Sequence, residues 1–123
     1  MRYRRLHGTD LQLSELGLGT WTLTTGWWGT YTDGEAIALM QQAFDLGITL
    51  FDAADTYGNG KSEDLIAQAF PNRRDEITIA TKIGYDVARH GNDERRGQTA
   101  IPHDFSPANP TYAPDAALHP LST

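Results

Sequence analysis

Cysteine is absent from this 123-residue chain, and no apolar run approaches the length of a membrane span. Without cysteine, neither a disulfide framework nor a thiolate metal site can form, which fits a cytosolic protein. A spanning helix needs about 18 apolar residues or more, so we expect a soluble, cytoplasmic protein. Basic residues are also in deficit, 10 against 16 acidic ones, and most are scattered. The sequence therefore gives no sign of a nucleic-acid-binding surface.

Proline is scarce until the end of the chain, where five of the six prolines lie between residues 102 and 123. From Gly84 onward the composition becomes polar, and no helical or strand period survives. We therefore expect a folded region over residues 1–84 and an irregular region over 85–123. The second region would be a long loop followed by a disordered, proline-rich tail.

The stretch around which the chain is organised begins with the apolar run Ile48 to Phe51, which ends abruptly at Asp52. A continuous apolar run is typical of a strand that is buried on both faces, as in a parallel sheet covered by helices. Ligand chemistry in such sheets gathers where the strands end. Tyr57 follows in a glycine-containing loop, and Lys82 ends a later β-branched run, so we expect these two residues and Asp52 at that edge.

The remaining patterns predict a hairpin, then strands alternating with helices. Strands and helices that alternate at this interval are typical of right-handed βαβ units in an α/β fold with a parallel sheet. The first helix has a capping box, in which Thr32 is the N-cap and Glu35 the third helical residue, and Gly47 stops it. We expect Ser62 to cap the second helix and Pro71 to end it. The predicted elements are hairpin strands over 2–6 and 11–15, a strand over 16–21, a helix over 33–46, a strand over 48–52, a helix over 62–70 and a strand over 77–82.

Aromatic side chains are concentrated in the loop predicted after the first parallel strand. This loop holds Trp21, Trp27, Trp28 and Tyr31 among glycines and threonines. Such a density of aromatics favours a pocket for a carbon-rich substrate. The alternative is that these side chains simply cover the rim of the fold.

A carboxylate, a phenol and an amine at one sheet edge suit the reduction of a carbonyl group. A tyrosine with a pKa near ~10 is a poor acid at neutral pH, but a neighbouring ammonium favours its phenolate. Lys82 would supply that ammonium, Asp52 would keep Lys82 charged and oriented, and Tyr57 would protonate the carbonyl oxygen. In the alternative interpretation, Asp52 binds loop amides, Tyr57 packs on the rim and Lys82 is solvated.

Several spaced motifs resemble the aldo-keto reductase family. The segment Phe51 to Gly58, followed by Ser62-Glu63, resembles the family signature in which an aspartate precedes the catalytic tyrosine by five positions. The segment 79–82, Ile-Ala-Thr-Lys, resembles the lysine strand of the family, and 16–21, Leu-Gly-Leu-Gly-Thr-Trp, resembles its first barrel strand. Segments 95–98 and 104–107 resemble a loop of one bacterial branch.

The resemblance implies the N-terminal part of a (β/α)8 TIM barrel, with a hairpin and about three βα units in residues 1–84. It also implies an NADP(H)-dependent oxidoreductase that acts on aldehydes, ketones or aldose-like sugars. The residues implied are Asp52, Tyr57 and Lys82 for catalysis and Gly19, Thr20, Trp21 and Asp52 for cofactor binding.

The resemblance ends near Pro107, where a proline-rich ending replaces an expected amphipathic helix. This departure predicts a truncated or frame-shifted copy of a longer gene, so we expect little turnover from the isolated chain. The fourth catalytic residue of the family is a histidine on the next strand. His119 lies at a plausible distance from Lys82 in the sequence but stands among prolines, and His90 and His103 fit that role less well.

The sequence raises two rival functions. Gly60-Lys61-Ser62 resembles the end of a P-loop, but Asp55 stands where that motif requires glycine, and its carboxylate would repel phosphate. A non-catalytic fragment or an accessory binding subunit is the stronger alternative, because chains resembling aldo-keto reductases also serve as partners of other proteins. The four histidines lack the spacing of metal ligands, so we expect no metal site.

Overall fold

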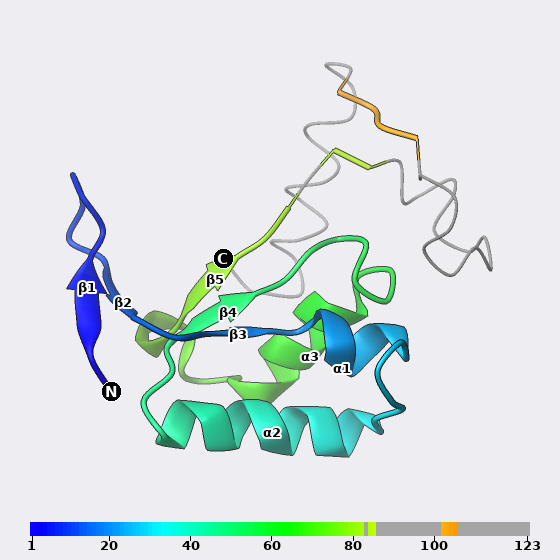
Figure 1. Cartoon of the computed structure of the whole chain (residues 1–123), viewed down its shortest axis with the longest axis horizontal. Helices are drawn as coiled ribbons and strands as arrows, with labels where there is room; N and C mark the ends of the chain where they lie inside the picture. Colours follow the sequence, from blue (N-terminus) through cyan, green and yellow to red (C-terminus); the bar gives the residue numbers. More distant parts are fainter. Residues whose placement is uncertain (83, 86–101, 106–123) are drawn as a thin grey trace.

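The computed structural model describes residues 1–82, 84–85 and 102–105. Within these ranges a two-stranded hairpin and a three-stranded parallel sheet form, and helices cover one face of the larger sheet (Figure 1). The predicted α/β architecture is therefore present. The proposed division at residue 84 stays a prediction, because most of 85–123 lies outside the described residues.

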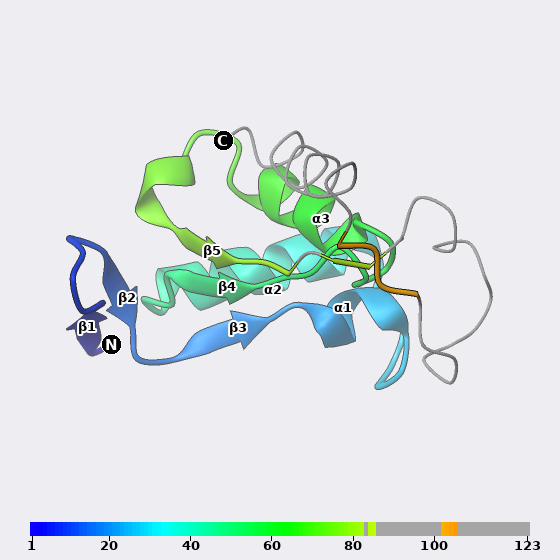
Figure 2. The ribbon, with the colours of Figure 1, turned by 90° about the horizontal axis from the view of Figure 1, so that it is seen from above.

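The parallel sheet consists of β3 (Gly17–Gly19), β4 (Leu50–Asp52) and β5 (Thr78–Ala80), with β4 in the centre (Figure 2). Gly19 pairs with Asp52, and Asp52 pairs with Ala80, so the three strands end in one row. The strands lie where the sequence predicted them but are shorter. This register places Asp52 at the middle of the edge where the strands end.

The hairpin of β1 (Tyr3–Arg5) and β2 (Gln12–Ser14) confirms the first predicted element. It lies beside the ends at which β3, β4 and β5 begin (Figure 2). The Ser14 hydroxyl oxygen accepts hydrogen bonds from the backbone amides of Thr49, at 2.9 Å, and Leu50, at 3.2 Å. The hairpin is thus tied to the start of β4, at the end of the sheet away from Asp52.

Helix α2 (Asp33–Asp45) begins and ends as the sequence predicts. The Glu35 amide donates to the Thr32 hydroxyl at 3.3 Å, and the Thr32 amide donates to the Glu35 carboxylate at 2.8 Å. This reciprocal pair satisfies two backbone groups that a helix start leaves open. Gly47 then turns the chain with a φ of 93°, a conformation that L residues with a side chain rarely adopt.

The prediction for residues 16–31 was partly wrong, because a short helix, α1 (Trp21–Thr25), begins at the last residue of the predicted strand and occupies the start of the predicted loop. The Thr25 hydroxyl donates to the Trp21 carbonyl at 2.8 Å, and Leu23 is buried in the core. The burial of Leu23, one turn from the sheet, outweighs the low helix propensity of this segment.

The prediction that Ser62 caps the second helix was also wrong. Helix α3 (Lys61–Ala69) begins earlier, and its N-cap is Gly60, which has a φ of 84°. Ser62 lies inside the first turn, fully buried, and its hydroxyl contacts Thr20 rather than a helix amide. A 3-10 turn, η1 (Arg74–Glu76), then leads into β5.

The core lies between the sheet and the helices. Leu18, Phe51 and Ile79 share one row of the sheet and pack on this side, and Phe51 is fully buried. The helices and their flanking segments supply the remaining buried side chains, which include Met40, Leu65, Ile66 and Phe70.

The expectation that β4 is buried on both faces was wrong for the described part of the chain. Side chains alternate along a strand, so Leu50 and Asp52 point away from the face on which Phe51 packs. Both are only partly buried, because no helix among the described residues covers that face (Figure 1). Asp52 is thus accessible from the side opposite the core.

The capping box of α2 gives a first testable prediction. Thr32→Ala should lower the free energy of unfolding by about 1 kcal/mol, because it leaves the Glu35 amide without its acceptor. Urea unfolding followed by circular dichroism measures this change. The exposed Thr30, which precedes the helix, gives the control Thr30→Ala, and equal losses in the two variants would contradict the assignment.

Candidate active site

The three side chains predicted to act together are in contact. The Lys82 ammonium donates to both carboxylate oxygens of Asp52, at 2.8 and 3.0 Å, and to the Ala53 carbonyl at 2.9 Å. The Tyr57 hydroxyl donates to Asp52 Oδ1 at 3.4 Å. Lys82 Nζ also lies 4.7 Å from the centre of the Tyr57 ring. A phenol, an ammonium and a carboxylate therefore share one hydrogen-bonded cluster at the strand ends.

The electrostatics of the cluster keep its lysine charged. Burial lowers the pKa of the Lys82 ammonium, but the hydrogen bonds and charges of Asp52 and Tyr57 outweigh burial, so the pKa lies above its ordinary value. The Lys82 and Asp52 side chains are each 46% exposed. An ion pair this open to water contributes little to folding stability. The pair therefore orients the side chains of the cluster more than it stabilises the fold.

A tight turn carries Tyr57 back toward Asp52. The Tyr57 amide donates to the Ala54 carbonyl at 3.0 Å, and the Gly60 amide donates to the Asp55 carbonyl at 2.8 Å. Gly58 has a φ of 63°, and a Cβ placed there would meet Thr24 of α1 at 3.0 Å. A side chain at Gly58 would thus be strained and crowded at once. The turn is fixed in shape, and so is the backbone that carries Tyr57.

Two carboxylates behind the cluster, Asp55 and Glu63, received no role from sequence reasoning. Both oxygens of Asp55 are buried, and within the described ranges neither has a well-formed hydrogen bond. Burial raises the pKa of Asp55, and the backbone amides of Thr56 and Tyr85 and the charge of Lys82 offset only part of this effect.

Glu63 is 3% exposed and accepts a hydrogen bond from the Thr81 hydroxyl at 2.6 Å. Burial raises its pKa, the Thr81 hydroxyl opposes this, and the charges of Asp55 and Asp64 add to it. The signal for its burial was present in the sequence. Glu63 lies three positions before Ile66, on the stripe of α3 that faces the core.

The residues predicted to bind the cofactor surround the end of β3. Gly19 is exposed, and a Cβ built there would have no atom within 4 Å, so a ligand can approach its backbone. Thr20 is 1% exposed, and its hydroxyl donates inward to the Asp52 carbonyl at 2.8 Å. Trp21 is half-buried at the start of α1, with its ring 5.6 Å from that of Trp27. Their roles toward a cofactor stay predictions.

The aromatic loop lies next to α1 and remains open to solvent. Trp27 is 48% exposed, Trp28 72% and Tyr31 38%. The loop thus presents apolar surface instead of burying it against the described part of the fold. A substrate-lining role for these side chains stays a prediction.

Two of the residues that resembled a P-loop, Lys61 and Ser62, contact other side chains of the chain. Lys61 forms an ion pair with Asp33 at 2.5 Å, and Ser62 is buried against Thr20. Neither side chain is presented to a phosphate group, which argues against a nucleotide hydrolase.

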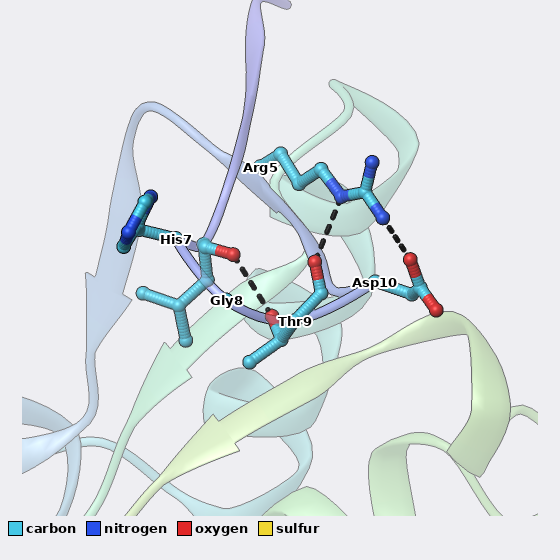
Figure 3. Close-up of a pocket in the computed structure, with 6 residues that line it drawn as sticks. Arg5, His7, Gly8, Thr9 and Asp10 are labelled. Atoms are coloured by element: carbon cyan, nitrogen blue, oxygen red, sulfur yellow. Dashed lines mark hydrogen bonds and ion pairs between the residues drawn. The ribbon is translucent and has the colours of Figure 1, made fainter.

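A hollow of about 420 Å³ at the hairpin turn lies away from the cluster (Figure 3). The guanidinium of Arg5 points toward Asp10, with which it forms an ion pair, and donates to the Thr9 carbonyl at 2.7 Å. His7 points away from this pair. The opposing charges in the hollow are thus paired with each other.

Of the histidines weighed for the fourth catalytic role, His119 and His90 lie outside the described residues. His103 is described, and its ring centre lies 4.6 Å from that of Tyr85. Over the described ranges, no three histidine, cysteine or carboxylate groups are placed to hold a metal ion. No described helix is long and apolar enough to cross a membrane.

Comparison with known proteins gives the family. The model of the Aldo/keto reductase family matches residues 15–107. The chain belongs to this family. The match includes every residue of the Asp52, Tyr57 and Lys82 cluster.

Two curated proteins and one solved structure illustrate the similarity. Aldo-keto reductase YhdN of Bacillus subtilis is 35% identical over 102 residues, which cover 77% of this chain and 31% of that protein. A probable voltage-gated potassium channel subunit beta of Oryza sativa subsp. japonica is 34% identical over 87 residues, 68% of this chain and 25% of that protein. Aldo-keto reductase AKR11C1 from Bacillus halodurans, solved in its holo form, superposes with a TM-score of 0.78 at 32% identity, covering 100% of this chain and 37% of that one.

These matches confirm the predicted fold class, the N-terminal part of an aldo-keto reductase barrel. The chain spans about a third of the length of the relatives that it matches. The predicted gene truncation or frameshift stays a prediction.

The raised pKa of Asp55 gives a second testable prediction. A carboxyl group whose pKa is higher in the folded than in the unfolded chain stabilises the fold at low pH, and this stability is lost as pH rises through the folded value. Asp55→Asn should therefore flatten the fall in stability between the unperturbed aspartate value of about 3.9 and neutral pH. Urea midpoints measured across this range test the slope.

The exposed, uncharged Asn72 gives the control, since Asn72→Ala removes no ionisable group and should leave the pH slope as it is in the unmodified chain. An unchanged slope in Asp55→Asn would contradict the account of Asp55.

Proposed function

We propose that this chain carries the catalytic strand ends of an NADP(H)-dependent oxidoreductase that reduces aldehydes and ketones, with Tyr57 as general acid. The observation that carries the proposal is the cluster in which Lys82 and Tyr57 both donate to the Asp52 carboxylate, at 2.8 and 3.4 Å. The cluster lies at the carboxyl ends of parallel strands, where enzymes of barrel folds hold their catalytic groups.

The cofactor fits the described residues at the end of β3. The exposed backbone of Gly19 leaves room for a flat ring, and Trp21 and Asp52 flank the same edge. We propose that these residues hold the nicotinamide, which supplies a hydride to the carbonyl carbon when it is bound. Family membership and the similarity to AKR11C1, solved in its holo form, support this assignment.

Proton delivery falls to Tyr57. As the carbonyl carbon gains a hydride, its oxygen gains negative charge and takes the proton of the Tyr57 hydroxyl, which yields the alcohol and a phenolate. The Lys82 ammonium, 4.7 Å from the ring, stabilises that phenolate electrostatically. Asp52 holds the ammonium through two hydrogen bonds and so fixes its position.

The environment of the cluster suits a small, carbon-rich carbonyl compound. Asp52 and Lys82 are partly open to solvent, and the exposed aromatic loop around Trp27 and Trp28 adjoins α1 near the end of β3. These rings would supply apolar contact to a substrate. A cytoplasmic location belongs to the same proposal and is supported by the cysteine-free composition.

A second candidate function is that of an accessory subunit that keeps the fold without turnover. The observation in its favour is the similarity to the probable potassium channel subunit beta of rice, which matches 87 residues at 34% identity. The two functions differ in the fate of bound NADPH. A reductase consumes NADPH with an aldehyde, whereas an accessory subunit binds it and leaves it unchanged.

A third testable prediction separates these functions. With a generic aldehyde, whatever rate of NADPH oxidation the chain shows should fall about 100-fold or more in Tyr57→Phe, the loss typical of a missing general acid. Tyr3→Phe is the matched control, since this tyrosine lies on the hairpin and binds the Gly47 carbonyl. The loss of NADPH absorbance measures the rate, and quenching of tryptophan fluorescence measures binding.

Equal rates in the unmodified chain and Tyr57→Phe would refute the role of Tyr57. Binding of NADPH without turnover in the unmodified chain would favour the accessory subunit.

A further inference from the structure

Two adjacent side chains in the first turn of α3, Ser62 and Glu63, are polar but buried. Ser62 is 0% exposed and Glu63 is 3% exposed. Burying a hydroxyl or a carboxyl group costs free energy unless hydrogen bonds compensate it. Both side chains form such hydrogen bonds.

Ser62 connects the backbone segments that carry Asp52 and Tyr57. Its amide donates to the Tyr57 carbonyl at 3.1 Å, and its hydroxyl lies 2.5 Å from the Thr20 hydroxyl. The Thr20 hydroxyl donates its single proton to the Asp52 carbonyl, at 2.8 Å. In the contact between the two hydroxyls, Ser62 is therefore the donor and Thr20 the acceptor. The Thr20 amide donates to the same carbonyl at 3.0 Å. Ser62 therefore completes a chain of bonds from Tyr57 to Asp52.

Glu63 holds the backbone segment that carries Lys82, the third member of the cluster. Its carboxylate accepts from the hydroxyl of Thr81, which directly precedes Lys82, at 2.6 Å. Since Lys82 follows the end of β5 and is itself exposed, this bond anchors the segment from which the ammonium reaches Asp52.

We propose that Ser62 and Glu63 are the positioning residues of this site: together they fix the backbone on which Asp52, Tyr57 and Lys82 stand. Neither touches substrate or cofactor in this role. The catalytic meaning of the proposal rests on the proposed function, but the geometric claim does not.

Burial and charge argue that Glu63 is kept for its hydrogen bond. Burial disfavours its ionised form, and the neighbouring charges of Asp55 and Asp64 disfavour that form further. An apolar side chain at this position would avoid both costs. The bond to Thr81 is the described contact that a leucine could not replace.

A chemical-labelling experiment on Lys82 tests the proposal without any need for turnover. The sequence contains two lysines, Lys61 and Lys82, so Lys61→Arg leaves Lys82 as the only one. The rate at which an acylating reagent modifies Lys82 at pH about 9, measured by mass spectrometry against a lysine-containing reference peptide, follows the fraction of free amine. The groups that act on this amine are Asp52, Tyr57 and the more distant Asp55.

In this background, Ser62→Ala and Glu63→Leu should each accelerate labelling of Lys82, by up to about tenfold, which corresponds to one unit of pKa. Asp52→Asn serves as the reference, because it gives the labelling rate of Lys82 when the charge of its ion-pair partner is lost. Glu63→Gln keeps an acceptor oxygen for Thr81 and should stay near the unmodified rate. If Glu63→Gln behaves as Glu63→Leu does, the role of Glu63 is overturned.

Ser14 provides the matched control. It is also a buried serine, 3% exposed, and it bonds the amides of Thr49 and Leu50 at the opposite end of β4. Ser14→Ala should lower the urea midpoint by about as much as Ser62→Ala does, but it should leave the rate of Lys82 labelling unchanged. Equal acceleration in Ser14→Ala and Ser62→Ala would show general loosening and overturn the proposal. The proposal would also be overturned if Lys82 were labelled faster in Asp52→Asn but at an unchanged rate in Ser62→Ala.

The same variants separate this proposal from the reductase assignment. If the chain turns over, Ser62→Ala should lower kcat more than it raises KM, since Ser62 supports the acid and its neighbours rather than the substrate. If Lys82 labelling responds as expected while Tyr57→Phe leaves turnover unchanged, the positioning role stands and the reductase assignment fails.

Discussion

The hydrogen-bonded ion pair between Asp52 and Lys82 is the interaction on which the arrangement of the site depends. It links Asp52, the last paired residue of β4, to Lys82, which follows the end of β5, and it gives the Tyr57 hydroxyl its acceptor. Because both charged side chains are almost half exposed, the pair adds little to stability. Its contribution is to orient the side chains at an edge whose backbone is already held by bonds such as those from Thr20 to the Asp52 carbonyl.

In the described fold, the helices support the strand ends from one face of the sheet, and the candidate site is open to solvent on the other face. Helices α2 and α3 cover one face of the sheet, and their apolar side chains pack on Leu18, Phe51 and Ile79. Buried polar groups at the start of α3 then reach around the strand ends from the same side. Asp52 and Gly19 lie in the next row along the strands and are open to the other face. Family membership and this arrangement together favour a site held from the helical side and entered from the opposite one.

Sequence reasoning was most successful where the determinants are local. The capping box of Thr32 and Glu35 and the turn at Gly47 follow from local spacing. The meeting of Asp52, Tyr57 and Lys82 at one edge was predicted from the shared direction of parallel strands, and it also needs the tertiary register of the sheet. Sequence reasoning failed where a tertiary partner decides. Ser62 has the chemistry of an N-cap, but Thr20, 42 positions away in the sequence, takes its hydroxyl. The burial of Asp55 was missed because it depends on tertiary packing, whereas the burial of Glu63 could have been predicted from its place on the stripe of α3 that faces the core. Most of the expected irregular tail lies outside the described ranges.

The parallel register of the sheet has a consequence for how the site comes into being. Asp52 and Lys82 stand 30 positions apart and meet only because Asp52 pairs with Ala80. A slip of one residue would turn Ile79 out of the core and carry Lys82 to the wrong side of the strand. The cluster of Asp52, Tyr57 and Lys82 thus cannot be assembled by local structure alone, and its appearance during folding would report that β4 and β5 have already paired in the native register.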